Sequence, residues 1–84
     1  MIKVGDTVYV NKLGRSEYVG KGTVQDICTD IQDLDRFFDE SHPFHSTYLS
    51  WLKKGKDIYI VDLESNIGKA GFLVQELSHE LVKN

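Results

Sequence analysis

The spacing of apolar residues changes twice along the chain, and this limits the folds that the chain can adopt. Apolar residues lie in short β-branched and aromatic runs in the first third, recur at intervals of three and four between residues 30 and 54, and return to β-type runs from residue 57. Short β-branched and aromatic runs, or apolar residues at every second position, are typical of strands, whereas intervals of three and four are typical of one helix face. The chain is therefore expected to be mainly β with one helical insertion.

Five segments have the composition of strands, at residues 7–10, 22–27, 57–63, 70–74 and 80–83. They are rich in β-branched and aromatic residues, and turn-forming residues lie between them. The alternation of the second segment is imperfect at its end. Residues 11–20 are polar and too many for a tight hairpin turn, which predicts a long loop after the first strand.

The insertion, at about residues 30–54, is predicted to hold two short helices. The apolar face of the first comprises Ile31, Leu34, Phe37 and Phe38. Asp30 can cap its N-terminus, and Pro43 requires the helix to stop before it. The second helix follows Pro43 and ends at Gly55. Its apolar residues are Tyr48, Leu49, Trp51 and Leu52.

The length and composition favour binding over catalysis. With 84 residues, the chain is expected to form a single domain, residues 1–84, around one core. Its apolar fraction of 40% and charged fraction of 27% are ordinary for a globular protein. An expected stability of only about 4–9 kcal/mol leaves little to hold a strained catalytic site. We therefore expect no enzyme activity and no cofactor.

Cysteine content and hydropathy bear on the compartment. Cys28 is the only cysteine, so no disulfide can form within the chain, and a reducing cytoplasm is the expected setting. The first residues run directly into a strand pattern without the features of a signal peptide. No window approaches the ~18 apolar residues of a spanning helix, so the sequence predicts no membrane insertion.

Segments at the two ends of the chain share a pattern with a known group of folds. Residues 4–10 read VGDTVYV, residues 20–24 read GKGTV, and residues 72–82 read FLVQELSHELV. These segments resemble SH3-like small β-barrels, in particular the KOW-type barrels and the small barrels of photosystem I. The resemblance implies a five-stranded barrel that binds RNA, DNA, peptides or protein subunits. The helical insertion between the second and third strands departs from the family pattern, in which a short loop is usual.

The insertion concentrates aromatic and acidic side chains. The residues predicted to contact a partner protein are Phe37, Phe38, Phe44, Tyr48, Trp51, Asp33 and Asp35. Aromatic residues are enriched at the centres of protein interfaces, and carboxylates steer basic partners. The alternative is a lid that closes one end of the barrel, with the acidic run as a solvated helix face. We expect a binding module that contacts another protein through the insertion and the long loop.

Other functions are open from the sequence. A KOW-like nucleic-acid surface would use Lys12, Arg15, Lys21, Lys53 and Lys54, although the net charge of −3 disfavours contact with phosphates. An inhibitor-type protein would dock the acidic stretch on a basic site. His42 and His45 have the spacing of metal ligands, but Pro43 lies between them and no metal is expected. Cys28 is expected to be buried rather than nucleophilic.

Overall fold

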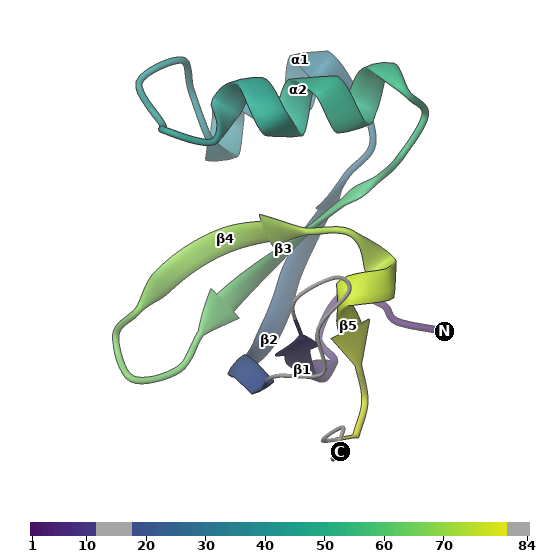
Figure 1. The fold of residues 1–84 in the computed structure, drawn as a ribbon, viewed down its shortest axis with the longest axis vertical. Coiled ribbons are helices and arrows are strands. Elements are labelled where there is room, and N and C mark those ends of the chain that lie inside the picture. The colour runs from purple at the N-terminus through teal and green to yellow at the C-terminus, as the bar shows by residue number, and fades with distance from the viewer. Residues whose placement is uncertain (12–17, 81–84) are drawn as a thin grey trace.

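The computed structural model describes residues 1–11 and 18–80, which form an antiparallel sheet with two helices at one end (Figure 1). The strands are β1 (Thr7–Asn11), β2 (Tyr18–Cys28), β3 (Ile58–Leu63), β4 (Gly68–Phe72) and β5 (Leu77–Ser78). The helices are α1 (Ile31–Phe37) and α2 (His45–Lys53), and a 3₁₀ turn, η1 (Val74–Glu76), lies between β4 and β5. The mainly β fold and the helical insertion between the second and third strands are thus confirmed.

The sheet is curled but not closed, so the expectation of a closed barrel is wrong. Its strand order is β4-β3-β2-β1-β5, with β4 and β5 at the two edges. The 3₁₀ turn η1 connects these two edge strands. Within it, the Leu73 N–H donates to Glu76 Oε1 at 3.0 Å and the Glu76 N–H donates to the Leu73 carbonyl at 3.0 Å. The strand order contains no pair between β4 and β5.

Strand β5 is Leu77–Ser78, a segment that was not predicted as a strand, and it pairs with Val10 and Tyr9 of β1. Of the strand expected at residues 80–83, residues 81–83 lie outside the described residues. Leu77 is 8% exposed and packs inside the curled sheet, which favours pairing at this position. After it, the Ser78 hydroxyl donates to the Glu80 carbonyl at 2.6 Å, so the chain bends at the residue where the strand was expected to begin.

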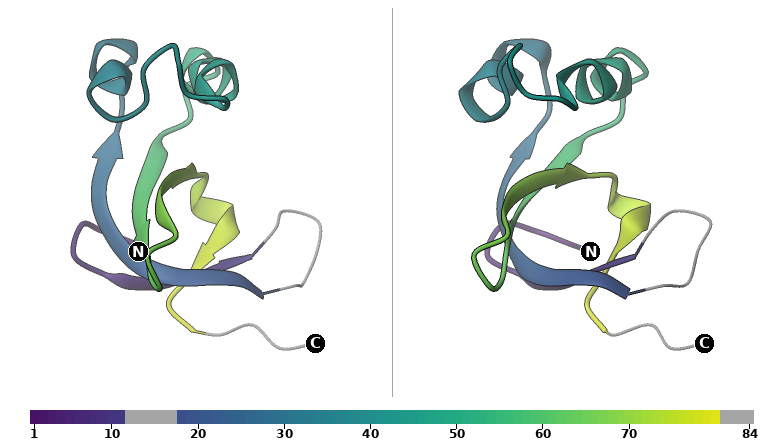
Figure 2. Two further views of the ribbon diagram at one scale, coloured as in Figure 1. Left: turned by 90° about the vertical axis from the view of Figure 1, so that its left-hand side faces the viewer. Right: turned by 60° about the vertical axis from the view of Figure 1, so that its left-hand side comes forward.

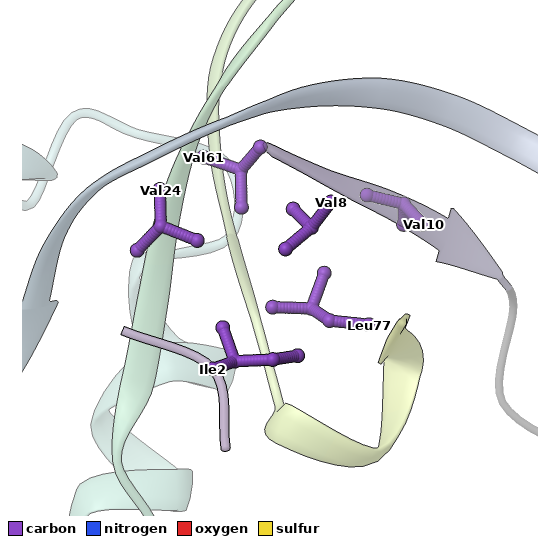
Figure 3. Close-up of a cluster of buried hydrophobic side chains, with 6 residues drawn as sticks. All are labelled: Ile2, Val8, Val10, Val24, Val61 and Leu77. Atoms are coloured by element: carbon purple, nitrogen blue, oxygen red, sulfur yellow. The ribbon is translucent and has the colours of Figure 1, made fainter. Parts of the chain in front are cut away.

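Two groups of buried side chains lie on opposite faces of the sheet. The sheet-interior cluster, shown in Figure 3, consists of Ile2, Val8, Val10, Val24, Val61 and Leu77. The helix-facing cluster consists of Cys28, Leu34, Phe38, Tyr48, Ile58 and Ile60. Strand β3 supplies residues to both, because successive side chains of a strand point to opposite faces. The two helices lie side by side beyond the ends of β2 and β3 (Figure 2), and they cover the second cluster.

A β-bulge in β2 explains the imperfect alternation of its sequence. The register with β3 shifts between Val24, which pairs with Val61, and Asp26, which pairs with Ile60. A bulge adds one unpaired residue and reverses which later side chains face a given side. Val24 therefore lies in the sheet-interior cluster, while Cys28 faces the helices.

Helix α1 begins at the predicted cap. Asp30 Oδ1 accepts the Asp33 N–H at 2.8 Å, and the helix runs from Ile31 to Phe37. Of the predicted apolar face, Leu34 and Phe38 are buried and Phe37 is half-buried, whereas Ile31 is 47% exposed. Among the residues that the structure describes, neither helix reaches the length and hydrophobicity required to cross a bilayer.

Leu34 and Ile31 of α1 differ in burial, so their substitutions are expected to affect stability differently. Leu34→Ala removes a fully buried side chain of the helix-facing cluster, and we expect it to lower the free energy of unfolding by about 2–5 kcal/mol. The matched control is Ile31→Ala in the same helix, which should cost less than ~1 kcal/mol because this side chain is largely exposed. Urea denaturation of both variants measures the difference, and equal losses would contradict this packing of α1.

Candidate functional site

An apolar groove lies between helix α2 and the edge strand β4. Its volume is about 300 Å³, near the lower end of the ~300–1,000 Å³ typical of ligand pockets. The lining residues are Phe44, Thr47, Tyr48, Trp51, Ala70, Gly71, Phe72 and Glu76. The groove is therefore built from the insertion on one side and from β4 and η1 on the other.

The helix side of the groove is a row of three aromatic rings. Phe44, Tyr48 and Trp51 are separated by four and three residues, which places them along one face of the helix. The ring centroids of Phe44 and Tyr48 lie 6.4 Å apart, and those of Tyr48 and Trp51 lie 5.5 Å apart. Tyr48 is buried, Trp51 is half-buried and Phe44 is 57% exposed. Tyr48, at the centre of the row, is thus the most buried of the three rings, and Phe44, at the N-terminal end of α2, is the most exposed.

Small residues of β4 bring the strand close to Tyr48. A Cβ atom at Gly71 would lie 2.6 Å from Ile58 Cγ2 and 3.0 Å from Tyr48 Cε1, so only glycine fits without displacement. The Gly71 N–H donates to the Tyr48 hydroxyl at 3.0 Å. A glycine within a strand is a known sign of a close approach by another segment. It is the sequence signal that would have located this side of the groove, which the predicted contact residues did not include.

Two titratable groups border the apolar surface, and both accept hydrogen bonds from the backbone of the fold. Tyr48 accepts from Gly71, and Glu76 Oε1 accepts from Leu73. Burial raises the pKa of Tyr48, the hydrogen bond from Gly71 opposes this shift, and the negative charge of Glu76 adds to it. The phenol of Tyr48 therefore stays neutral at physiological pH, and Glu76 is the charged group of the groove.

The predicted contact residues divide between the groove and other environments. Phe44, Tyr48 and Trp51 come together in the groove, whereas Phe38 is 4% exposed in the helix-facing cluster. Phe37 is half-buried, and the Arg36 guanidinium lies 5.4 Å from its ring centroid.

The two predicted acidic contacts have partners within the insertion. Asp33 Oδ1 accepts from Arg36 Nη1 at 2.8 Å, and Asp35 Oδ1 lies 3.2 Å from His45 Nε2. Neither residue lines the groove.

The basic residues of the nucleic-acid alternative that the structure describes do not converge. Lys21 lies near the end of the β2–β3 ladder where Gly22 pairs with Leu63, while Lys53 ends α2 at the opposite end of this ladder. Lys54, which follows Lys53, is exposed. Lys21 lies 3.9 Å from Glu64 and 5.6 Å from the ring centroid of Tyr9. Lys12 and Arg15 lie outside the described residues.

The histidines and the cysteine have local roles in the described structure. His42 Nδ1 accepts the Phe44 N–H at 3.1 Å, and His45 contacts Asp35, so the two rings have different partners. Within residues 1–11 and 18–80, no group of three or more potential ligands is arranged to hold a metal ion. Cys28 is fully buried, and burial raises the pKa of its thiol. This disfavours the thiolate that a nucleophile requires.

Tyr48→Phe should destabilise the protein while keeping the ring. Without the hydroxyl, the buried N–H of Gly71 lacks its acceptor, at a cost of about 1–3 kcal/mol measured by urea denaturation. The control is Tyr59→Phe, because this half-buried tyrosine has no hydroxyl hydrogen bond among the described contacts.

The raised pKa of Tyr48 predicts a second difference between the wild type and Tyr48→Phe. Wild-type stability should fall as pH rises above 10, where the unfolded tyrosine ionises first, and Tyr48→Phe should lack this component.

Gly71→Ala tests the close approach of β4 to α2. The new methyl group must displace Ile58 or Tyr48, so we expect a loss of about 1–3 kcal/mol in the free energy of unfolding. In the control Gly20→Ala, the atom nearest to the new methyl group is Leu63 Cδ2 at 3.4 Å. The flexible side chain of Leu63 can accommodate this contact. Similar stability of the two variants in urea would refute the tight packing at Gly71.

The groove brings together aromatic rings, a close-packed glycine and one carboxylate, and it combines two parts of the chain far apart in sequence. Comparison of the chain with protein-family models, with curated proteins and with solved structures gives no match.

Proposed function

We propose that this protein is a non-enzymatic binding module that holds a segment of another protein in the groove between α2 and β4. The observation that carries the proposal is the row of aromatic rings along the groove, in which Phe44 is 57% exposed. Aromatic side chains in partly open pockets provide much of the binding energy at protein interfaces. Burial of the exposed part of such a ring against a partner is favourable because apolar surface leaves water.

The polar groups of the groove favour binding over chemistry. Tyr48 and Glu76 are its titratable residues, and each already accepts a backbone hydrogen bond. Among the described residues that line the groove, no hydrogen bond joins a nucleophile to a base, which is the pairing that activates a nucleophile in a catalytic site. We therefore propose that the groove recognises a ligand without transforming it.

The partner is proposed to bind through its side chains rather than by adding a strand to β4. An edge strand offers unpaired N–H groups to a further strand. Here the Gly71 N–H is used by Tyr48, and just beyond β4 the Leu73 N–H is used by Glu76. A strand added along this edge would have to displace both acceptors, which favours side-chain insertion into the groove instead.

The remaining parts of the proposal concern the fold of the sheet, the extent of the contact surface and the cellular location. We propose that the curled sheet is an SH3-like barrel left open between β4 and β5, a view supported by the order of the strands and by the single turn before the last one. Residues 12–17, which belong to the predicted long loop, lie outside the described residues, and only the sequence supports the proposal that they extend the contact surface. A cytoplasmic location is supported by the buried free thiol of Cys28.

The two alternatives have weaker support. A nucleic-acid surface requires clustered cations, but Lys21 and Lys53 lie at opposite ends of the β2–β3 ladder. An acidic inhibitor would present free carboxylates, whereas Asp33 pairs with Arg36 and Asp35 contacts His45. We therefore place the contact surface at the groove.

Peptide binding to the groove can be followed through Trp51, the single tryptophan of the chain. Peptides selected from a random display library against the wild-type protein should change the fluorescence of Trp51 on titration. Phe44→Ala should weaken their binding about tenfold or more, because removal of an interface anchor costs about 2 kcal/mol. The fold should survive this substitution, because Phe44 is mostly exposed.

The matched control is Ile67→Ala, which removes another exposed apolar side chain outside the groove. It should leave the affinity unchanged. A library that yields no peptide, or peptides that bind wild type and Phe44→Ala equally well, would refute the proposed contact surface.

A further inference from the structure

We propose that the groove between α2 and β4 recognises an arginine side chain of the partner protein, with the guanidinium between the aromatic rings and the carboxylate of Glu76. This inference rests on the proposed function, because it names the chemistry of the residue that enters the same groove. Four aromatic residues, Phe44, Tyr48, Trp51 and Phe72, and the single carboxylate of Glu76 line the groove.

The aromatic lining favours a cation. The face of an aromatic ring carries partial negative charge and attracts a cation within about 6 Å of its centroid. Of the rings that line the groove, Phe44 is 57% exposed and Trp51 and Phe72 are half-buried, so a ligand in the groove can contact more than one ring. A neutral apolar side chain would also fit against the rings. The preference for a charged ligand therefore depends on the carboxylate of the groove.

Glu76 provides that group. Its Oε1 accepts the Leu73 N–H, which holds the carboxylate at the groove. A carboxylate has about four lone-pair sites, so this single bond leaves further acceptor capacity. Within the described part of the chain, Glu76 forms no ion pair. The groove thus contains a negative charge that a cationic ligand would neutralise.

The choice of arginine over lysine follows from hydration and shape. A guanidinium is planar, is less strongly hydrated than an ammonium, stacks on aromatic faces and donates to a carboxylate through a fork of N–H groups. A mostly apolar groove imposes a larger desolvation cost on a lysine ammonium. The net charge of −3 also favours the approach of a cationic partner. The exposed lysines at the C-terminus of α2 do not line the groove.

The test uses five pools of blocked peptides that differ only in a fixed central residue, which is arginine, citrulline, lysine, trimethyllysine or leucine. Binding is measured through the NMR signal of the Trp51 indole N–H. The arginine pool should bind about tenfold more tightly than the citrulline pool, since a charge-assisted hydrogen bond has roughly this effect. Citrulline keeps the shape of arginine but lacks its charge.

The same pools are measured with Glu76→Gln. Glutamine can still accept from the Leu73 N–H, so the cap is kept while the charge is lost. The advantage of arginine over citrulline should disappear in this variant. It should persist in the control Glu64→Gln, which removes the same charge from an exposed residue outside the groove.

The outcomes separate the inference from the proposed function. If the pools bind with equal affinity and Phe44→Ala weakens all of them, the groove binds peptides but the arginine assignment is wrong. Tighter binding of the lysine, trimethyllysine or leucine pool than of the arginine pool would also overturn it, as would an arginine advantage that survives Glu76→Gln. If no pool shifts the Trp51 signal, the groove is not a peptide site, and the proposed function fails as well.

Discussion

The structure depends on strand β3 being buried on both faces. Ile58 and Ile60 pack under the helices, while Val61 packs inside the curled sheet, and all three are fully buried. Burial of each such side chain contributes about 1.5–3 kcal/mol. Because adjacent residues of one strand serve both clusters, the sheet and the helical insertion share their central element. The insertion is therefore packed as part of the fold rather than attached to it as a separate appendage.

The bulge in β2 makes this arrangement possible. It shifts the register between Val24 and Asp26, so the strand first faces the sheet interior with Val24 and then faces the helices with Cys28. Cys28 pairs directly with Ile58 at the end of the ladder, next to the start of α1. The two strands thus extend beyond the curled part of the sheet and carry the helices at its end (Figure 1).

The groove results from this placement of α2 against β4. Gly71 permits the close approach at Tyr48, whose hydroxyl joins the helix to the edge of the sheet. Farther along α2 the aromatic row continues to Phe44, which is mostly exposed. The same arrangement protects the edge strand, since Tyr48 uses an N–H that another strand would otherwise require. The occupied N–H groups and the exposed ring of Phe44 support the proposal that this surface recognises side chains.

Much of the secondary structure was predictable from the sequence. The change in apolar spacing predicted the helices between two groups of strands, and Asp30 was identified as the cap of α1 because its side chain can accept from the first turn. Phe44, Tyr48 and Trp51 were grouped from the sequence as candidate contact residues because they are neighbours in sequence, and they line one side of the groove. These features depend on residues a few positions apart in the sequence. At such short separations, local backbone geometry alone determines the relative positions of the side chains.

Features that depend on distant contacts were decided by the tertiary structure. The described sheet is open, and Leu77–Ser78 forms its edge strand β5 after a 3₁₀ turn capped by Glu76, with Leu77 packed in the interior. The second side of the groove comes from Gly71 and Phe72, some 20 residues from Tyr48 in the sequence and brought to it by the pairing of β4 with β3. Periodicity in a sequence reports which residues face the same way, whereas the partner that they face is set by packing of the whole chain.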